Sequence, residues 1–453
     1  MRLSTVVAAL SRALDLTEGQ AEGHAQRTLL IGMCLADSLG IDAAQRTALF
    51  YALLLKDAGC TASASRTAAL FAADDIALRR DGKLVDWHKS RQVLTYLIRH
   101  TAREARGVAR MGQALSVART LKSEGHLIVE ARCHQGASIV RSLGLDPAAS
   151  EAVRDLDEHW DGGGHPRGLA GHQIGILARI GCVAQTAEVF VTVFGRDAAR
   201  RMVAERTGRW FDPEVAGAFL GISDRHPVWE ALTSPDLTAA ALRAQEPGDM
   251  LIEATEERLD RVADAFALVI DAKSPWTNRH SHGVAHWATE LSGLMGMSPE
   301  ERPAFRRCAL LHDIGKLAVS SRILDKPGPL SASERVQVER HAATSEHILA
   351  QVPTLANWAA TAGAHHERLD GTGYHRGLTA GSLTPAMRAL AVADVYDALT
   401  ATRPYRAPMD RDEALALIAN DRGKALCPTA CDALTVVTKT NHEDSPSTGF
   451  EFR

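Results

Sequence analysis

The sequence has few aromatic residues, few cysteines, little net charge and few long apolar runs, and each shortage excludes a class of protein. Phe, Trp and Tyr together make up 5% of its 453 residues, and its seven scattered cysteines form no disulfide framework. A net charge of −4 without a strongly basic stretch argues against nucleic-acid binding. The N-terminus lacks a small-residue cleavage site, and runs such as ALFYALLL stop well short of the roughly 18 apolar residues of a membrane helix. We therefore expect a cytoplasmic protein with no nucleic-acid or membrane partner.

Sustained alternation of apolar and polar residues, which indicates half-buried strands, is also missing. Apolar residues instead recur at three- and four-residue steps, as Phe305, Cys308 and Leu311 do. Ser331 followed by Glu334 matches the capping box that begins many helices. Because the chain is too long for one core, these patterns predict an all-α protein of more than one domain.

The sequence contains an internal repeat. The segment HDIGK at residues 312–316 matches KDAGC at residues 56–60. An offset of 256 residues relates the first group of pairs, which are His24 with His280, Lys56 with His312 and Asp57 with Asp313. Downstream, His134 pairs with His341 at an offset of 207, while DGGGHPRGLAG pairs with DGTGYHRGLTAG and Gln185 with Asp394 at 209. The pattern predicts a duplication with about 49 additional residues in the first copy.

The repeat sets the predicted domain boundaries. We expect a first domain at 1–225, a proline-rich linker at 226–249, a second domain at 250–438 and a disordered tail at 439–453. The second domain should begin with a long helix at about 250–272, which carries an apolar stripe with a seven-residue period. That stripe either seats the helix on its own bundle or pairs it with a second chain in a homodimer.

The second copy concentrates histidine and aspartate at positions marked by the repeat. These candidate metal ligands are His280, His312, Asp313, His341, His365, His366 and Asp394. Such nitrogen and oxygen ligands suit iron, manganese, zinc or nickel. A carboxylate beside an imidazole is suited to bridging two ions, and a pair of ions roughly 3.5–4 Å apart activates a bridging water for phosphoryl transfer. Lys316 lies one turn after His312, where its ammonium can neutralise a phosphate. Four further histidines (His282, His286, His347 and His375) and the pair Cys427 and Cys431 are interpreted as surface or structural residues.

Four motifs in order, LLHDIGKL, ILDKPGPLSASE, HHERLDGTGYH and VADVYDALTATRPYR, resemble the HD-GYP branch of the HD-domain phosphohydrolases over residues 275–432. The resemblance implies a bundle of about five core helices with a metal cluster at its centre, bound by the seven residues above. The cluster would contain two divalent ions, with iron or manganese preferred to zinc or nickel. Asp313 would bridge the ions and Lys316 would lie beside the scissile phosphate. The residues implied to contact the nucleotide are Gly371, Gly373, Tyr374, Arg403 and Arg406.

The activity that the resemblance implies is hydrolysis of cyclic di-GMP to the linear pGpG and on to GMP. Another cyclic dinucleotide or nucleotide remains an alternative substrate, and a catalytically silent, metal-loaded nucleotide-binding scaffold is an alternative of a different class. Three positions depart from the family pattern. His375 replaces the proline of the signature loop, Trp276 stands where three-metal members place a glutamate, and Gly283 replaces an arginine that the first copy keeps as Arg27. We therefore expect two metals rather than three.

The resemblance extends more weakly over residues 20–225, where ligand positions have changed. His24, Asp57 and His134 remain, while the substitutions are Lys56 for a histidine, Cys60 for the lysine, Leu156 and Asp157 for the histidine pair, and Gln185 for the last aspartate. A two-metal centre cannot assemble from these residues. They are either remnants of a polar core or a single-ion site on His24, Asp57 and His134, and we expect the first copy to act as a regulatory or packing module.

Overall fold

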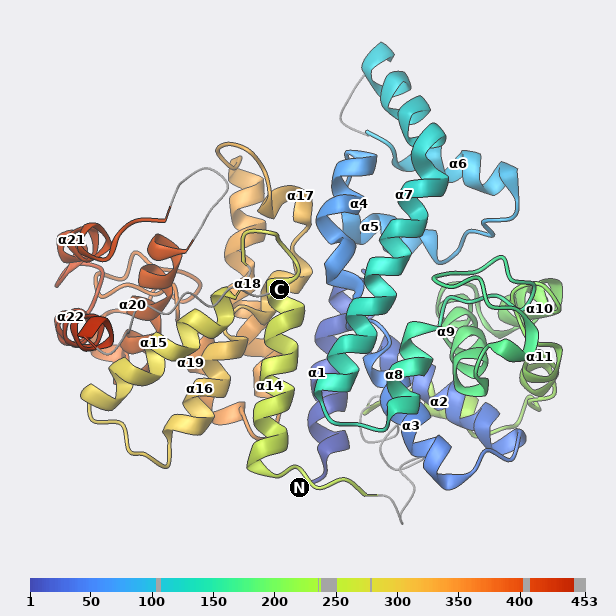
Figure 1. The fold of residues 1–453 in the computed structure, drawn as a ribbon, viewed down its shortest axis with the longest axis horizontal. Helices are drawn as coiled ribbons and strands as arrows, with labels where there is room; N and C mark the ends of the chain where they lie inside the picture. Colours follow the sequence, from blue (N-terminus) through green and yellow to red (C-terminus); the bar gives the residue numbers. More distant parts are fainter. Residues whose placement is uncertain (103–106, 235, 238–250, 278, 402–407, 444–453) are drawn as a thin grey trace. The chain divides into compact units, whose positions relative to one another are not determined.

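The computed structural model describes residues 1–102, 107–234, 236–237, 251–277, 279–401 and 408–443, and these are helices joined by loops (Figure 1). Within those ranges there are isolated β-bridges but no strand. The predicted all-α class is confirmed. All seven cysteines are unpaired and buried, as the absence of a disulfide framework predicted.

The chain forms two compact units. The first comprises Met1–Pro275 with Leu317–Glu334, and the second comprises Trp276–Lys316 with Arg335–Arg453. The domain boundaries taken from the sequence stay a prediction, but these units divide the chain elsewhere, because residues 251–275 and the segment after Lys316 pack with the first copy. The expected tail at 439–453 also starts too early, since α22 continues to Glu443.

The first unit is a bundle in which α2 packs against α3 and α9, with buried side chains such as Leu29, Leu53 and Val183 between them. Its helices are α1 (Leu3–Thr17), α2 (His24–Ser38), α3 (Ala43–Leu55), η1 (Cys60–Ser63), α4 (Ala64–Phe71), α5 (Asp75–Gly82), α6 (Ser90–His100), α7 (Gly107–Ser142), α8 (Pro147–Arg154), η2 (Gly171–Gln173), α9 (Ile176–Phe194), α10 (Arg196–Arg206), α11 (Pro213–Leu220), α12 (Val228–Ala231), α14 (Glu256–Asp271) and α17 (Ser321–Leu324).

Helix α9 is long and apolar enough to cross a membrane by composition alone, with a mean hydropathy of 1.5 over residues 176–194. The expectation that every apolar run falls short therefore missed this helix. In the bundle, 56% of that stretch is buried against neighbours that include α2, α8 and α10. Core helices of globular proteins show the same composition, so the helix by itself is weak evidence for a membrane span.

Helix α14 is the predicted long helix at about 250–272, and it begins where the Thr255 hydroxyl accepts a hydrogen bond from the Arg258 amide. Its buried face, which includes Leu259 and Phe266, packs against α1 and α7 of the same unit (Figure 1). Because α1 and α7 cover this face, the structure favours the alternative in which the apolar stripe seats the helix on its own bundle rather than against a second chain. Dimerisation stays a prediction.

A buried polar network fastens residues 317–334 to the first unit. Asp75, at the start of α5, accepts hydrogen bonds from the Lys273 ammonium at 2.8 Å, the Ser321 amide at 2.7 Å and the Ser320 hydroxyl at 3.0 Å. All four residues are buried. Because a buried carboxylate needs charge-assisted partners, this network holds the segment that follows Lys316 in one place.

The second unit holds the better-preserved copy. Its helices are α15 (His280–Leu294), α16 (Arg302–Leu311), η4 (Ile314–Ala318, which continues into the first unit), α18 (Ala332–Ala350), η5 (Ala356–Trp358), α19 (Ala359–Gly363), η6 (Ala380–Ser382), α20 (Pro385–Thr400), α21 (Arg411–Asp421) and α22 (Pro428–Glu443). The capping box is confirmed, since the Ser331 amide donates to the Glu334 carboxylate at 2.7 Å and the Glu334 amide donates to the Ser331 hydroxyl at 3.3 Å. Central helix α15 packs against α16, α20 and α22.

Candidate metal centre

The seven candidate ligands, spread over more than a hundred residues, meet inside the second unit. They form three overlapping groups, each with ligand atoms within 4.8 Å of one another: His341, His365 and His366; His280, His312 and Asp394; and His312, Asp313 and His365. His280 opens α15, Asp394 lies on α20 and His341 lies on α18. The structure therefore brings together every residue predicted as a ligand, while their binding of metal stays a prediction.

Hydrogen bonds on the outer ring nitrogens orient these imidazoles. The Nδ1 atoms of His312, His341 and His365 donate to the backbone carbonyls of Ala309, Val338 and Ala362, at 2.7, 2.5 and 2.5 Å. Each ring therefore presents its Nε2 lone pair to the interior of the cluster.

As a consequence, acceptor atoms face acceptor atoms across the cluster. The Nε2 atoms of His341 and His365 are 3.0 Å apart, and His341 Nε2 lies 3.2 Å from Asp313 Oδ1. Within the described residues, His312 Nε2 and Asp313 Oδ1 are buried without a hydrogen-bond partner. Such an arrangement is costly unless a cation lies between the lone pairs. The nitrogen and oxygen donors fit divalent transition-metal ions.

Lys316 extends from the edge of this cluster to solvent. Its ammonium lies 2.5 Å from Asp313 Oδ2, and its side chain is 21% exposed. Burial alone would raise the pKa of Asp313, but the Lys316 ammonium and the His312 ring hold it well below its usual range. Asp313 is therefore a carboxylate, as a bridging ligand must be.

A glycine allows the ligand-bearing segments to meet. A Cβ on Gly315 would lie 2.0 Å from the His341 carbonyl oxygen, and the Gly315 amide donates to the Ser345 hydroxyl at 2.9 Å. Only glycine permits this approach of η4 to α18, which brings Asp313 to His341. Gly59 does the same in the first copy, where a Cβ would lie 1.9 Å from the Arg132 carbonyl oxygen.

The loop that carries the predicted nucleotide contacts is fixed by Glu367, whose buried carboxylate accepts hydrogen bonds from the Arg376 and Leu378 amides at 2.7 and 2.8 Å. Gly371 has a φ of +76°, and a Cβ on Gly373 would lie 2.4 Å from Glu367 Cα. Tyr374 is thereby placed with its ring centroid 4.8 Å from that of His366. Arg403 and Arg406 lie outside the described residues.

The ring of His375, which replaces the motif proline, lies 2.9 Å from a Glu346 carboxylate oxygen. This residue was interpreted as a surface or structural histidine, and it is an exposed residue whose side chain contacts α18. Glu346 also accepts a hydrogen bond from Arg376 at 3.1 Å. The substitution therefore supplies a side-chain contact that a proline could not make.

Asp397 was missed by the sequence analysis. Its Oδ2 accepts a hydrogen bond from His280 Nδ1 at 2.6 Å, which turns His280 Nε2 toward the metal-ligand cluster. A Cβ on Gly283 would lie 1.9 Å from Asp397 Oδ1, so glycine replaces the family's arginine where this carboxylate approaches α15. The repeat could have revealed Asp397, because Glu188 lies 209 residues earlier and contacts His24.

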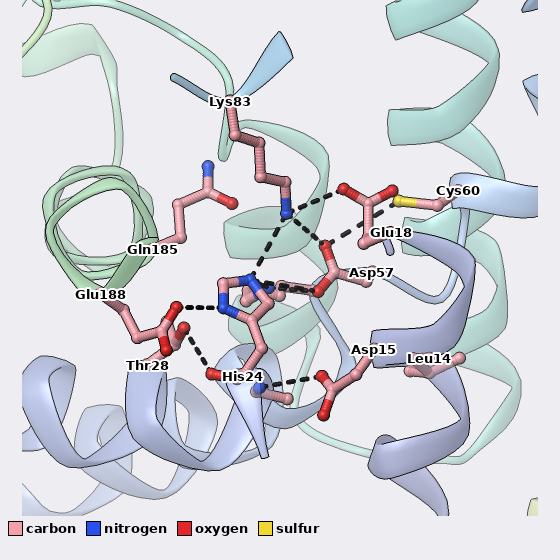
Figure 2. A network of polar contacts seen from close by, with 12 residues as sticks. Leu14, Asp15, Glu18, His24, Thr28, Asp57, Cys60, Lys83, Gln185 and Glu188 are labelled. Atoms are coloured by element: carbon pink, nitrogen blue, oxygen red, sulfur yellow. Dashed lines mark hydrogen bonds and ion pairs between the residues drawn. The ribbon is translucent and has the colours of Figure 1, made fainter. Parts of the chain in front are cut away.

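The corresponding centre of the first copy is filled by the ammonium groups of two lysines. Figure 2 shows that of Lys83 among Glu18, His24 and Asp57. Lys56 contacts Asp57 and lies 2.8 Å from His24 Nε2. Lys83 reaches the same place from the end of α5, 2.8 Å from Glu18 Oε2 and 3.5 Å from Asp57 Oδ1. We call the cluster of Glu18, His24, Lys56, Asp57 and Lys83 the first centre.

The pairing of His134 with His341 is wrong. Arg132 takes that position, because its carbonyl faces Gly59 as that of His341 faces Gly315, and its guanidinium contacts Asp157. The offset is thus 209 residues, and the first copy has 47 extra residues rather than about 49. The His134 side chain is 60% exposed, with its nearest carboxylate on Glu130 at 4.0 Å. A single-ion site on His24, Asp57 and His134 is therefore excluded by geometry.

The model of the HD domain family matches residues 99–215 and 264–428. The chain belongs to this family, and the resemblance drawn from its motifs is confirmed. It is 35% identical over 432 residues to 3'3'-cGAMP-specific phosphodiesterase 3 of Vibrio cholerae, which covers 95% of this chain and 94% of that protein.

Two further similarities concern the second copy and the fold. The cyclic di-GMP phosphodiesterase response regulator RpfG of Xanthomonas campestris is 35% identical over 181 residues, 40% of this chain and 48% of that protein. The crystal structure of a cyclic GMP-AMP specific phosphodiesterase of V. cholerae (V-cGAP3) matches with a TM-score of 0.64 and 30% identity. That match covers 97% of this chain and 98% of the other, so it includes both units.

Proposed function

We propose that this chain is a metal-dependent phosphodiesterase that opens a cyclic dinucleotide, and that its substrate is 3'3'-cGAMP. One observation carries the choice of substrate: the similarity to a 3'3'-cGAMP-specific enzyme extends over 95% of the chain, including the altered first copy. Cyclic di-GMP, the substrate implied by the motifs, is the second candidate. It is favoured by the similarity to RpfG, which covers only 40% of the chain.

The chemistry divides between bound ions and side chains. The seven clustered residues would hold two divalent ions, which lower the pKa of a water and stabilise charge on phosphoryl oxygens. Lys316, partly exposed beside Asp313, is positioned to neutralise a substrate phosphate. Asp397 holds His280 in its ligand orientation. Water adds across one phosphodiester bond, and the product is a linear dinucleotide.

Turnover of purified, metal-loaded protein with 3'3'-cGAMP, cyclic di-GMP and cyclic di-AMP tests the proposal, with products separated by chromatography. We expect kcat/KM for 3'3'-cGAMP to exceed the other values at least about tenfold. Asp313→Asn should lower kcat about a thousandfold or more, because it removes a ligand charge. Asp432→Asn, a change in an exposed carboxylate of the same unit, is the matched control.

Each result has one meaning. A higher kcat/KM for cyclic di-GMP would overturn the substrate and keep the enzyme. Equal turnover by the Asp313→Asn variant and the wild type would overturn the metal centre. Binding of a dinucleotide without turnover by metal-loaded protein would favour the scaffold alternative.

A further inference from the structure

A second group of metal-ligating side chains lies in the first unit, outside the first centre. His88, His159 and Asp161 each offer one ligand atom, and these atoms lie within 4.8 Å of one another. His88 belongs to the segment between α5 and α6, whereas His159 and Asp161 follow α8. Two segments far apart in the sequence therefore bring two imidazoles and a carboxylate together.

His159 is held by its surroundings with one nitrogen left over. Its ring stacks on Trp210 at a centroid distance of 4.2 Å and an interplanar angle of 16°. The Arg206 guanidinium lies 4.1 Å from the centroid of the same indole. Among the described residues, His159 Nδ1 is buried and has no hydrogen-bond partner. A buried ring nitrogen with no partner is costly unless it binds a proton donor or a cation.

The backbone holds Asp161 and leaves room for His88. The Asp161 amide donates to the Arg209 carbonyl at 2.8 Å, and Asp161 Oδ1 accepts from the Gly163 amide at 2.9 Å. A Cβ on Gly163 would lie 2.9 Å from His88 Cε1 and 3.1 Å from Asp161 Oδ1. A side chain at position 163 would crowd the His88 ring and the Asp161 carboxylate, so glycine eases their approach at this point.

We propose that His88, His159 and Asp161 bind one divalent transition-metal ion, with Zn²⁺ the best match, and that water completes its coordination. Two imidazoles and one carboxylate form an open three-ligand set that binds zinc and its neighbours among the divalent metals. The ion ties the segment that starts at Lys83 to the loop after α8, and so holds Lys83 in the first centre.

The second copy does not carry this site. At the offset of 209 residues, Arg368 replaces His159 and Thr372 replaces Gly163. His88 comes from the region between Gly59 and Arg132, which is 47 residues longer than its counterpart. The proposed ion is therefore independent of the catalytic metal pair and of the reaction.

Zn²⁺ titration of the full-length holoenzyme, followed by gel filtration and elemental analysis, tests the site. The wild type should bind one more Zn²⁺ per chain than His88→Ala or Asp161→Asn, while kcat per catalytic centre stays unchanged. His134→Ala, which removes an exposed histidine of the same unit, should match the wild type. Anomalous diffraction from zinc-soaked crystals should show a peak between His88 and His159.

Equal Zn²⁺ content in the wild type and both variants would overturn the proposal, as would anomalous peaks confined to the second unit. If Asp161→Asn lowers the folded fraction, the His88→Ala result decides, because His88 is exposed. The Nδ1 atoms of His126 and His165 lie 3.2 Å apart elsewhere in the first unit. A zinc peak at that pair instead of at His88 and His159 would also count against the proposal.

Discussion

The two centres of this duplicated chain balance buried carboxylates in different ways. In the second centre, the cluster of seven candidate ligands, imidazole and carboxylate lone pairs face each other at distances such as 3.0 Å between His341 and His365. That arrangement calls for cations from solution. In the first centre the cations belong to the protein, because Lys56 contacts Asp57. Lys83 lies among Glu18, His24 and Asp57 (Figure 2).

The difference shows how a copy can lose metal without losing its fold. Burial would raise the pKa of Glu18, yet the Lys83 ammonium outweighs it and lowers that pKa to about 2. Arg132 likewise pairs with Asp157 at the positions of His341 and His366. Because buried charges stay paired, the first copy has kept the polar centre of the bundle, with side-chain cations at the positions of candidate metal ligands in the second copy.

The largest expected effect on turnover comes from giving the second centre the lysine that the first copy has at the matching position. His312→Lys places an ammonium where Lys56 stands in the first copy, within reach of Asp313. It should displace metal and lower turnover about a thousandfold or more, while the protein stays folded, as the first centre does. Metal content, kcat and circular dichroism measure this.

The reciprocal change is the control. Lys56→His should leave kcat within about twofold, since Lys83 and Arg132 still fill the first centre. Full activity of the His312→Lys variant would show that the lysine ammonium and the metal pair can occupy the centre together. It would contradict the view that lysine takes the place of metal in the first centre.

The next effect concerns Lys83. Lys83→Met leaves Glu18 buried without its closest cation, and removing one partner of a buried pair costs about 3–5 kcal/mol. Urea denaturation of the full chain measures the change, with the exposed Lys122→Met as its control. A decrease in the free energy of unfolding below about 1 kcal/mol would mean that the contact of Lys83 with Glu18 does not stabilise the first centre.

Much of this fold could be predicted because the sequence patterns that indicate it are local and occur in both copies of the repeat. Helical spacing, the Ser331 capping box and the HDIGK motif can be recognised in a single sequence, and the repeat marked the candidate ligand positions without an alignment, although it paired His341 with the wrong residue. The pairing of His134 failed because a two-residue error in the offset cannot be detected where only one short motif matches. The packing of Gly59 against Arg132 supplied the missing constraint.

Residues from the longer region of the first copy could not be found in this way. Lys83 and His88 have no counterpart in the second copy, so their contacts depend on how α5 and the following segment pack. The same holds for the contacts of Asp75 with Lys273, Ser320 and Ser321, which lie 198 to 246 residues away. Long-range ion pairs leave no periodic signal in a sequence, whereas helix faces do.

Asp75 tests whether the first unit contributes to catalysis in the second. Asp75→Asn removes the counter-charge of buried Lys273, which should cost about 2–3 kcal/mol. The segment it releases follows Lys316 and leads to α18, so kcat should fall severalfold with little change in KM. Asp75 is thus expected to be a positioning residue.

A double variant separates this effect from general destabilisation. Asp75→Asn with Lys273→Met removes the charges of this buried pair, while Arg79, the other cation beside Asp75, still has Glu18 at 3.9 Å. The double variant should therefore regain much of the stability. If kcat also stays low, the hydrogen bonds to Ser320 and Ser321 position the segment. If Asp75→Asn leaves kcat unchanged, the first unit is a packing module alone.

The smallest expected effect is a pH dependence that comes from Glu188, which contacts His24 of the first centre. Burial would raise the pKa of Glu188, but the contacts with His24 and Arg27 outweigh it and lower that pKa from its usual 4.5 to about 2. A carboxylate with a lowered pKa stabilises the folded state above pH 4.5, and this contribution is lost as the pH falls from 4.5 toward 2. Between pH 6 and 3 the loss amounts to about 2 kcal/mol.

Glu188→Gln should therefore flatten the dependence of urea stability on pH in that window, so that its curve converges with that of the wild type at low pH. The exposed Glu214→Gln should keep the wild-type slope, and parallel curves for all three proteins would show that the charge of Glu188 does not stabilise the first centre.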